Sequence, residues 1–196
     1  MALDAHTDQL RVPARVVRLR TLFVVAALAL LALAAFVVVN SIDGDGKGSQ
    51  GQLKGGSKDA FTLTYPASWR PLSQEEIDRL PSSPLAVVRR KDGKGLVVLR
   101  REKRAPRNFS AFSADLTRAL DRRVSDFQKR SSRTIKVRAG SAFFYSYIRK
   151  TKGTVHTVAL VPAGARSYVL NTVSPGGAED VARQIARIIL SFNVAR

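Results

Sequence analysis

Side chains that could perform acid–base chemistry are few in this sequence of 196 residues. His6 and His156 are the only histidines, and cysteine is absent, which excludes disulfides, thiolate metal sites and a thiol nucleophile. His156 lies in the alternating stretch Thr154-Val155-His156-Thr157-Val158, a setting in which a lone histidine is usually a surface or hydrogen-bonded residue. No G-x-S-x-G turn surrounds any serine. The sequence therefore predicts no catalytic residue and no enzyme, and a hydrolase built on His156 is the alternative.

Motifs that bind metals or phosphates are also missing from the sequence. It contains no H-E-x-x-H pattern, no acidic loop of the EF-hand type and no carboxylate cluster. The glycines and lysine between Gly44 and Ser49 lack the spacing of a phosphate-binding loop, and no strand pattern precedes them. Asn108-Phe109-Ser110 fits a glycosylation sequon, although such triplets are common by chance. We therefore expect neither a metal nor a cofactor.

Positive charge is the strongest chemical signal, because 33 Lys and Arg against 15 Asp and Glu leave a net charge of +18. Such an excess favours anionic partners. Three basic runs fall where the pattern predicts strand ends or turns. They comprise Arg89, Arg90 and Lys91; Arg100, Arg101, Lys103, Arg104 and Arg107; and Arg149, Lys150 and Lys152. We expect several of these side chains to share one edge of the domain and to bind an anionic partner; the alternative is a merely solvated basic surface.

Residues 21–39 carry no charge and predict a membrane-spanning helix. Nineteen residues in a helix span about 28 Å, close to the thickness of the hydrocarbon core of a bilayer. A cleaved signal peptide is the alternative, since Ala32-Leu33-Ala34 offers a weak cleavage site, but the apolar run continues past it through Val39. A buried core helix is disfavoured because the segment has no polar face.

The distribution of charge around this segment predicts its orientation. Arg11, Arg15, Arg18 and Arg20 precede it, while Asp43 and Asp45 follow. The positive-inside rule then places the tail of residues 1–20 in the cytoplasm and the C-terminal part outside the cell membrane. A protein with one such span is a single-pass membrane protein.

Composition divides the rest of the chain into a linker and one domain. Residues 40–58 are rich in Gly, Ser and charge, which predicts a flexible linker. Residues 59–196 show no second boundary and are expected to form one extracytoplasmic domain.

Local patterns in this domain predict strands, turns and a capped helix. Residues 61–65 alternate apolar side chains with threonine and end at Pro66, as in a strand. Ser73 and Glu76 have the spacing of a capping box, which begins a short helix. Residues 85–90 and 96–102 flank Asp92-Gly93, the signature of a tight hairpin turn.

The second half of the domain predicts two longer helices around a group of strands. Apolar residues three or four apart indicate a helix over residues 109–129. They are Phe112, Leu116, Leu120, Val124 and Phe127. Strands are expected at residues 135–138, 142–149, 155–161 and 168–173, and a terminal helix at 178–192. Short turns between the strands imply an antiparallel sheet, so the fold class is α+β with helices covering the sheet.

The stretch from Asp59 to Trp69, DAFTLTYPASW, resembles the F-x-x-x-Y-P-x-x-W opening of the PsbP-like superfamily, which includes the photosystem II extrinsic subunit, DcrB and the LpqN lipoproteins. The resemblance extends over residues 59–196 by order of elements. It implies an α/β/α sandwich and a non-enzymatic accessory role in the envelope or a lumen. The lipid-modified cysteine of bacterial relatives is absent, so here an apolar helix replaces that anchor. No ligand-binding residue of the family maps onto this sequence.

These observations predict a membrane-anchored, non-catalytic envelope protein whose basic domain binds an anionic surface or a partner protein. Candidate partners are anionic lipid, a cell-wall polymer or an envelope protein. Nucleic acid is disfavoured because no nucleic-acid-binding module is recognised and the domain is expected outside the cytoplasm. A small-ligand carrier, with a pocket between sheet and helices, is the main alternative. The sequence does not predict an oligomeric state.

Overall fold

The computed structural model describes residues 50–56, 60–102, 106, 108–164 and 166–194. The cytoplasmic tail and the membrane-spanning segment predicted at residues 21–39 lie outside these ranges. None of the helices in the described ranges is both long and apolar enough to span a bilayer.

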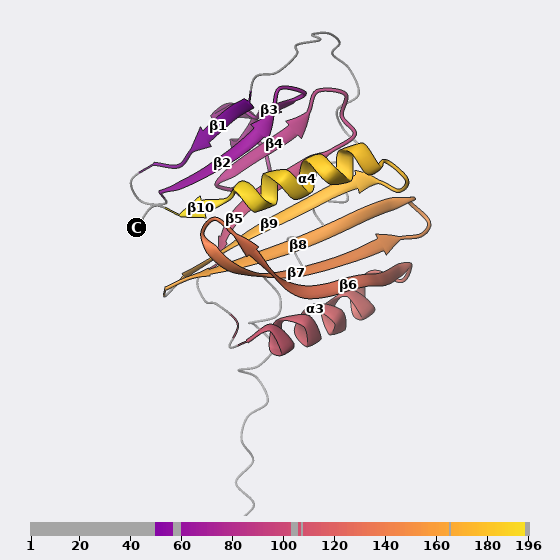
Figure 1. Cartoon of the computed structure of the whole chain (residues 1–196). Coiled ribbons are helices and arrows are strands. Elements are labelled where there is room, and N and C mark those ends of the chain that lie inside the picture. The colour runs from indigo at the N-terminus through magenta and orange to yellow at the C-terminus, as the bar shows by residue number, and fades with distance from the viewer. Residues whose placement is uncertain (1–49, 57–59, 103–105, 107, 165, 195–196) are drawn as a thin grey trace, which may run out of the picture.

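An antiparallel sheet of seven strands forms the centre of the domain, in the order β3-β4-β5-β9-β8-β7-β6 (Figure 1). Its strands are β3 (Trp69–Pro71), β4 (Ala86–Arg90), β5 (Leu96–Glu102), β6 (Phe127–Val137), β7 (Gly140–Arg149), β8 (Thr154–Ala163) and β9 (Arg166–Pro175). A smaller sheet has the order β1-β2-β10 and consists of β1 (Gln50–Lys54), β2 (Phe61–Pro66) and β10 (Asn193–Val194). The helices are α2 (Gln74–Asp78), α3 (Phe109–Arg123) and α4 (Glu179–Ser191). The predicted antiparallel sheet with helices is confirmed.

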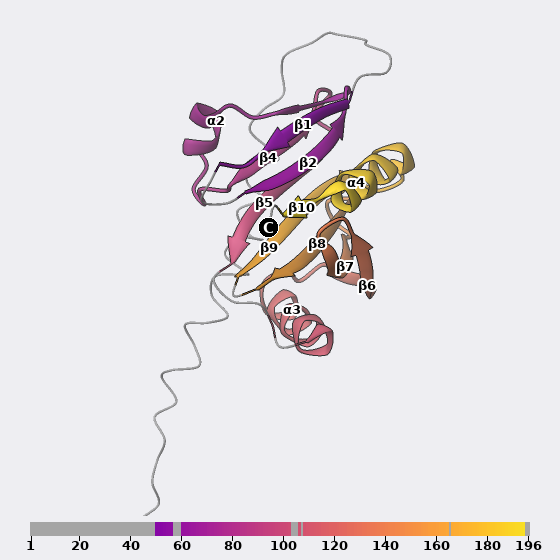
Figure 2. The same ribbon diagram turned by 60° about the vertical axis from the view of Figure 1, so that its left-hand side comes forward.

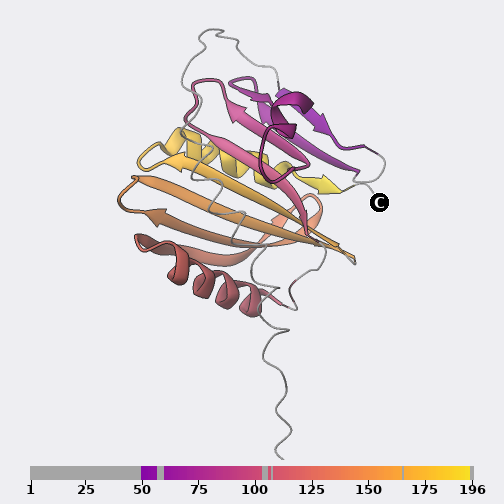
Figure 3. The same ribbon diagram turned by 180° about the vertical axis from the view of Figure 1, so that it is seen from behind.

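Helices cover both faces of the large sheet (Figures 2 and 3). On one face, α4 and the small sheet enclose the main core, where Trp69, Leu170 and Ile188 are almost completely buried. On the other face, α3 packs Leu116 and Leu120 against strands β7 to β9. The short helix α2 buries Ile77 against β4, β5 and β9 on that same face. Successive side chains of a strand point to opposite faces of the sheet, so each strand contributes alternate residues to the core under α4 and to the core under α3 and α2.

Several local predictions are confirmed by the backbone. Ser73 caps α2 by accepting a hydrogen bond from the Glu76 amide, and the Glu76 side chain accepts one from the Ser73 amide. Strands β4 and β5 pair as a hairpin in which Gly93 has a φ of 75°. The apolar face predicted for the terminal helix is the buried face of α4.

The predicted linker at residues 40–58 is wrong for residues 50–54, which form β1. This strand pairs with β2 from Gln50 opposite Pro66 to Lys54 opposite Thr62. Its side chains alternate between exposed and half-buried positions, and Leu53 packs against the core. A polar edge strand with a single apolar side chain has the composition of a linker, which explains the error.

The predicted helix at residues 109–129 is too long, because α3 ends at Arg123. Val124 leaves the helical conformation with φ −131° and ψ 88°, and Phe127 begins β6. Both side chains still pack on the cluster that α3 buries. The apolar spacing therefore continued after the backbone had changed from helix to strand.

Strand β6 is an edge of the large sheet and carries four cationic side chains. They are Lys129, Arg130, Arg133 and Lys136. The pairing with β7 shifts register between Lys129 and Ser131, which indicates a β-bulge.

Candidate functional site

The turn between β4 and β5 presents two of the basic residues to solvent. The Asp92 carboxylate accepts a hydrogen bond from the Lys94 amide at 3.0 Å, and the Arg90 amide donates to the Gly95 carbonyl at 2.9 Å. Gly93 supplies the positive φ that this tight turn requires. Lys91 and Lys94 are consequently exposed on a turn whose backbone is fixed.

The turn between β7 and β8 presents another pair of lysines. Gly153 has a φ of 56°, and its amide donates to the Lys150 carbonyl at 3.3 Å. The Lys150 amide donates to the Asp126 carbonyl at 3.1 Å, which joins the turn to the α3–β6 connection. Lys150 and Lys152 are exposed.

Strand pairing brings these two turns to the same end of the large sheet. Leu96, just after the first turn, is opposite Val173, and Thr154, just after the second, is opposite Pro175. The Gly176 amide then donates to the Gly153 carbonyl at 2.6 Å. We call this the hairpin end, defined by turn residues 91–95 and 150–153. It is on the right in Figure 1.

Two arginines of the hairpin end are held by carboxylates at the base of the turns. Arg90 lies 2.8 Å from an oxygen of Asp180 and 3.3 Å from one of Asp92. Arg149 binds one oxygen of Asp126 through Nε and Nη2, each at 2.8 Å. Hydrogen bonds from Thr151 and Arg149 lower the pKa of Asp126 to about 2. These arginines stabilise the turns and are less available to a ligand than the lysines.

The lysines of the hairpin end differ from the arginines because none of the four has a carboxylate within ion-pair distance among the described residues. Arg122 and Arg123, exposed in the last turn of α3, lie at the same end. The sequence reasoning did not include Lys94, Arg122 or Arg123 in the site. Lys94 could have been found from the turn itself, whereas the two arginines were hidden because the helix was predicted to continue beyond them.

Arg100 and Arg101, the described residues of the second basic run, lie towards the opposite end of the sheet, so they do not share an edge with the lysines of the two turns. Arg101 is exposed near the end of β5, and Arg100 binds the Ser82 hydroxyl. Burial lowers the pKa of Arg100, and burial raises the pKa of Glu102 nearby. Lys103, Arg104 and Arg107 lie outside the described residues.

Arg89 belongs to the first basic run and is half-buried. Its side chain lies on the face opposite α4, because its neighbour Val88 packs in the α4 core. Among the described residues, the Nε atoms of Arg89 and Arg100 are buried without a hydrogen-bond partner. Alternation along β4 and β5 is the reason: every second residue of a run points away from its neighbours.

His156 lies in β8 and is 5% exposed. Its ring stacks on Tyr147 at 4.9 Å between centroids, and Nε2 lies 3.0 Å from the Thr154 hydroxyl. Burial, followed by the charges of Arg149 and Lys152, lowers its pKa to about 4. No serine or carboxylate is hydrogen-bonded to the ring among the described residues.

A cavity of about 500 Å³ lies between β1, β2, β4 and α2. Its apolar lining comes from Leu53, Phe61, Leu72, Ile77, Leu85, Ala86 and Val87, and its polar lining from Lys54 and Gln74. Within the described ranges, no three His, Asp or Glu side chains gather as metal ligands.

No protein-family model and no curated protein sequence matches the chain. Among solved structures, cyanobacterial PsbP (CyanoP) from Synechocystis is similar with a TM-score of 0.53 and 13% identity, over 80% of this chain and 99% of that chain. The Ran-binding protein Mog1p of Saccharomyces cerevisiae (TM-score 0.47, 12% identity, 74% and 95% covered) is more distant. LpqN of Mycobacterium tuberculosis, a protein involved in cell envelope biogenesis, is also more distant, with a TM-score of 0.41 and 13% identity over 76% of this chain and 91% of that chain. Of these three similarities, that to CyanoP is strong enough to bear on the fold. The described part of the chain has a PsbP-like fold of antiparallel sheets and flanking helices.

Proposed function

We propose that this protein is a non-catalytic binding protein, anchored in a membrane by residues 21–39, whose extracytoplasmic domain binds an anionic partner through the hairpin end. The anchor is supported by the uncharged segment and by the four arginines that precede it.

One observation carries the binding role: at the hairpin end, the carboxylates nearest the turns pair with arginines while the lysines do not. Asp92 and Asp180 pair with Arg90, and Asp126 pairs with Arg149. The charges of Lys91, Lys94, Lys150 and Lys152 therefore remain to attract a ligand. Lysine carries a compact charge on a flexible stem and suits a surface of many phosphates or carboxylates better than one fixed geometry.

The binding role can be tested with the full chain in nanodiscs of phosphatidylcholine, using soluble inorganic polyphosphate as the probe. We expect binding at low salt that weakens steeply as salt is added, because screening shortens the reach of exposed charges. The hairpin-end variant, Lys91→Gln with Lys94→Gln and Lys152→Gln, should bind at least about tenfold more weakly, since each cation near an anionic surface contributes about 1 kcal/mol.

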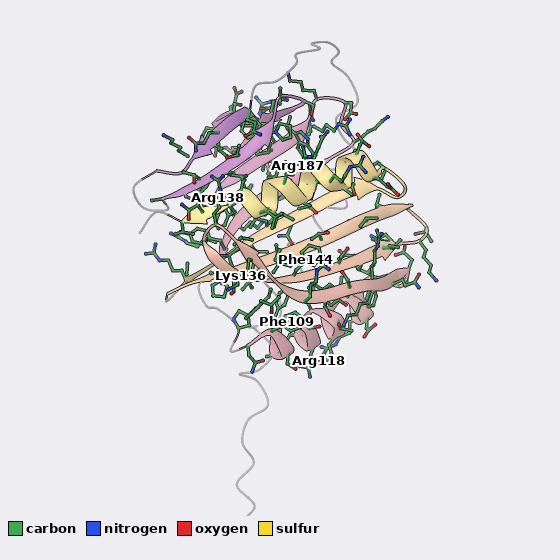
Figure 4. The ribbon with its side chains drawn as sticks, viewed as in Figure 1. Phe109, Arg118, Lys136, Arg138, Phe144 and Arg187 are labelled. Atoms are coloured by element: carbon green, nitrogen blue, oxygen red, sulfur yellow. The ribbon has the colours of Figure 1, made fainter. Side chains whose placement is uncertain are left out.

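The matched control variant is Lys136→Gln with Arg138→Gln and Arg187→Gln, which removes three exposed charges elsewhere. Figure 4 shows Lys136 and Arg138 at the end of the sheet opposite the hairpin end, and Arg187 on α4. The control should retain more affinity than the hairpin-end variant. Equal losses in the two variants, or no binding of the wild type at low salt, would contradict the proposed role.

A small-ligand carrier remains a second candidate because of the cavity beside α2. Its volume of about 500 Å³ lies in the range of ligand sites, and its walls are mainly apolar. An apolar fluorescent probe should then bind the full chain in nanodiscs, and Leu53→Trp should displace it, because the half-buried Leu53 lines the cavity and a larger side chain there would occupy it. Probe binding that Leu53→Trp leaves unchanged would exclude this cavity.

A further inference from the structure

We infer that the anionic partner of the hairpin end is the phospholipid surface of the membrane in which the protein's own chain is anchored. This inference rests on the proposed function and adds the identity of the partner. The place where β1 begins, the number of residues between β1 and the proposed anchor, and the charges beside that place support this partner.

The chain enters the domain at the hairpin end. Gln50, the first residue of β1, is opposite Pro66. Three residues later Trp69 is opposite Arg90, and the Lys91 amide donates to the Ser68 carbonyl at 2.9 Å. The start of β1 thus lies beside the turn that carries Lys91 and Lys94, as Figure 1 shows.

The segment between the anchor and β1 is short. Residues 40–49 are ten residues, which span at most about 36 Å when fully extended. A strand of ten residues such as β8 is about 33 Å long, so the opposite end of the sheet begins nearly one sheet length farther from the attachment point. The hairpin end can therefore meet the membrane with little extension of residues 40–49, whereas an upright domain with its opposite end on the membrane would need this segment to be almost fully extended.

The positive charge of the hairpin end is complementary to the phosphates of the lipid headgroups, which makes them the partner that we infer. Electrostatic attraction to an anionic leaflet decays over about 8 Å at physiological salt, so it favours the end of the domain that comes to the bilayer with the least extension of the chain. That end carries four exposed lysines on two turns, with Arg122 and Arg123 on the neighbouring end of α3. Covalent attachment makes the contact intramolecular, so weak individual contacts suffice.

The test uses the absence of native cysteine to place one fluorescent label at a time on the full chain. Ser125→Cys marks the hairpin end, because its neighbour Asp126 binds Arg149, and Ser141→Cys marks the opposite end beside the β6–β7 turn. Both serines are exposed. Each labelled protein is placed in nanodiscs of phosphatidylcholine with or without phosphatidylglycerol, containing a lipid whose headgroup quenches the label.

We expect phosphatidylglycerol to increase quenching at position 125 severalfold over position 141, and high salt to reverse the increase. The hairpin-end variant should lose the increase and the control variant should keep it. Equal quenching at the two positions, or quenching independent of phosphatidylglycerol, would overturn the inference. If polyphosphate still binds through the lysines in that case, the proposed function holds and the partner is a soluble polymer; if polyphosphate also fails to bind, both fail.

Discussion

The indole N–H of Trp69 donates a hydrogen bond to the side-chain oxygen of Gln184, with 2.6 Å between Nε1 and Oε1. Trp69 is 2% exposed, and this bond joins β3 to the middle of α4. The Ser68 hydroxyl donates to the same oxygen at 3.3 Å. The tryptophan of the F-x-x-x-Y-P-x-x-W motif therefore links β3, an edge strand of the large sheet, to helix α4 through a buried hydrogen bond.

Replacing Gln184 by Met should lower the free energy of unfolding by about 1–3 kcal/mol, because it leaves a buried indole N–H without an acceptor. The only tryptophan of the chain is Trp69, so its fluorescence can follow denaturant unfolding of the full chain in nanodiscs. In a Trp69→Phe background, where unfolding is followed by circular dichroism, Gln184→Met should lower the free energy of unfolding by less than it does in the wild type. An identical cost in both backgrounds would show that the bond contributes nothing.

Gly95→Ala should destabilise the domain by about 1–3 kcal/mol through overpacking. A Cβ at this position would lie 2.6 Å from the Trp69 ring and 3.0 Å from a Val181 methyl group. Both of these side chains are buried in the core and have little room to move. Gly56→Ala is the matched control, since a Cβ there meets nothing within 4 Å. Similar unfolding midpoints for the two variants would contradict this expectation.

Asp126→Asn should weaken the attachment of the β7–β8 turn to the α3–β6 connection and cost about 1–3 kcal/mol. The pKa of Asp126 is lowered to about 2 in the folded state, from an ordinary value of 3.8. Its stabilising charge is therefore complete above about pH 4 and is lost as the pH falls towards 2.

The measurement is urea unfolding of wild type and variant at several pH values. The difference between them should shrink as the pH falls from 4 towards 2. Asp115→Asn is the control, because Asp115 forms an exposed ion pair with Arg118 on α3, and the substitution should change the free energy of unfolding by less than about 1 kcal/mol.

His156 should make the domain acid-sensitive between about pH 6.5 and pH 4. The unfolded chain binds a proton near pH 6.5, whereas the folded domain resists protonation until the pH is near 4. Stability is therefore complete above pH 6.5 and falls as the pH decreases, by about 3 kcal/mol in total. His156→Gln should remove most of this slope in urea unfolding between the two pH values. A variant with the wild-type slope would assign the acid sensitivity to other groups.

Local signals allowed parts of this fold to be predicted from the sequence. The Asp92-Gly93 turn needs only the backbone freedom of glycine and an acceptor two residues before Lys94. The face of α4 is visible because Val181, Ile185 and Ile188 recur with the helical period and point into one core. Such features depend on residues close together in the sequence, so they can be predicted without knowing the fold.

Other parts depend on distant contacts and could not be predicted. β1 exists because β2 pairs with it, and β10 consists of two residues that pair with β2 through Phe61 and Thr62. The candidate site shows the same limit. Two basic runs meet at the hairpin end only because β9 pairs with β5 of one hairpin on one side and with β8 of the other hairpin on the other side. Arg100 points to an interior that its neighbour Arg101 does not share.

The cationic side chains of β6 have a consequence for copies of this domain that meet at high concentration. A second copy pairing along this edge would bring two rows of cations, each made of Lys129, Arg130, Arg133 and Lys136, within one strand spacing of each other. The bulge between Lys129 and Ser131 would also disturb the ladder. Neighbouring copies would then repel one another at the strand where a sheet could otherwise continue from molecule to molecule. The edge that completes each domain thus also protects it from fibre-like aggregation.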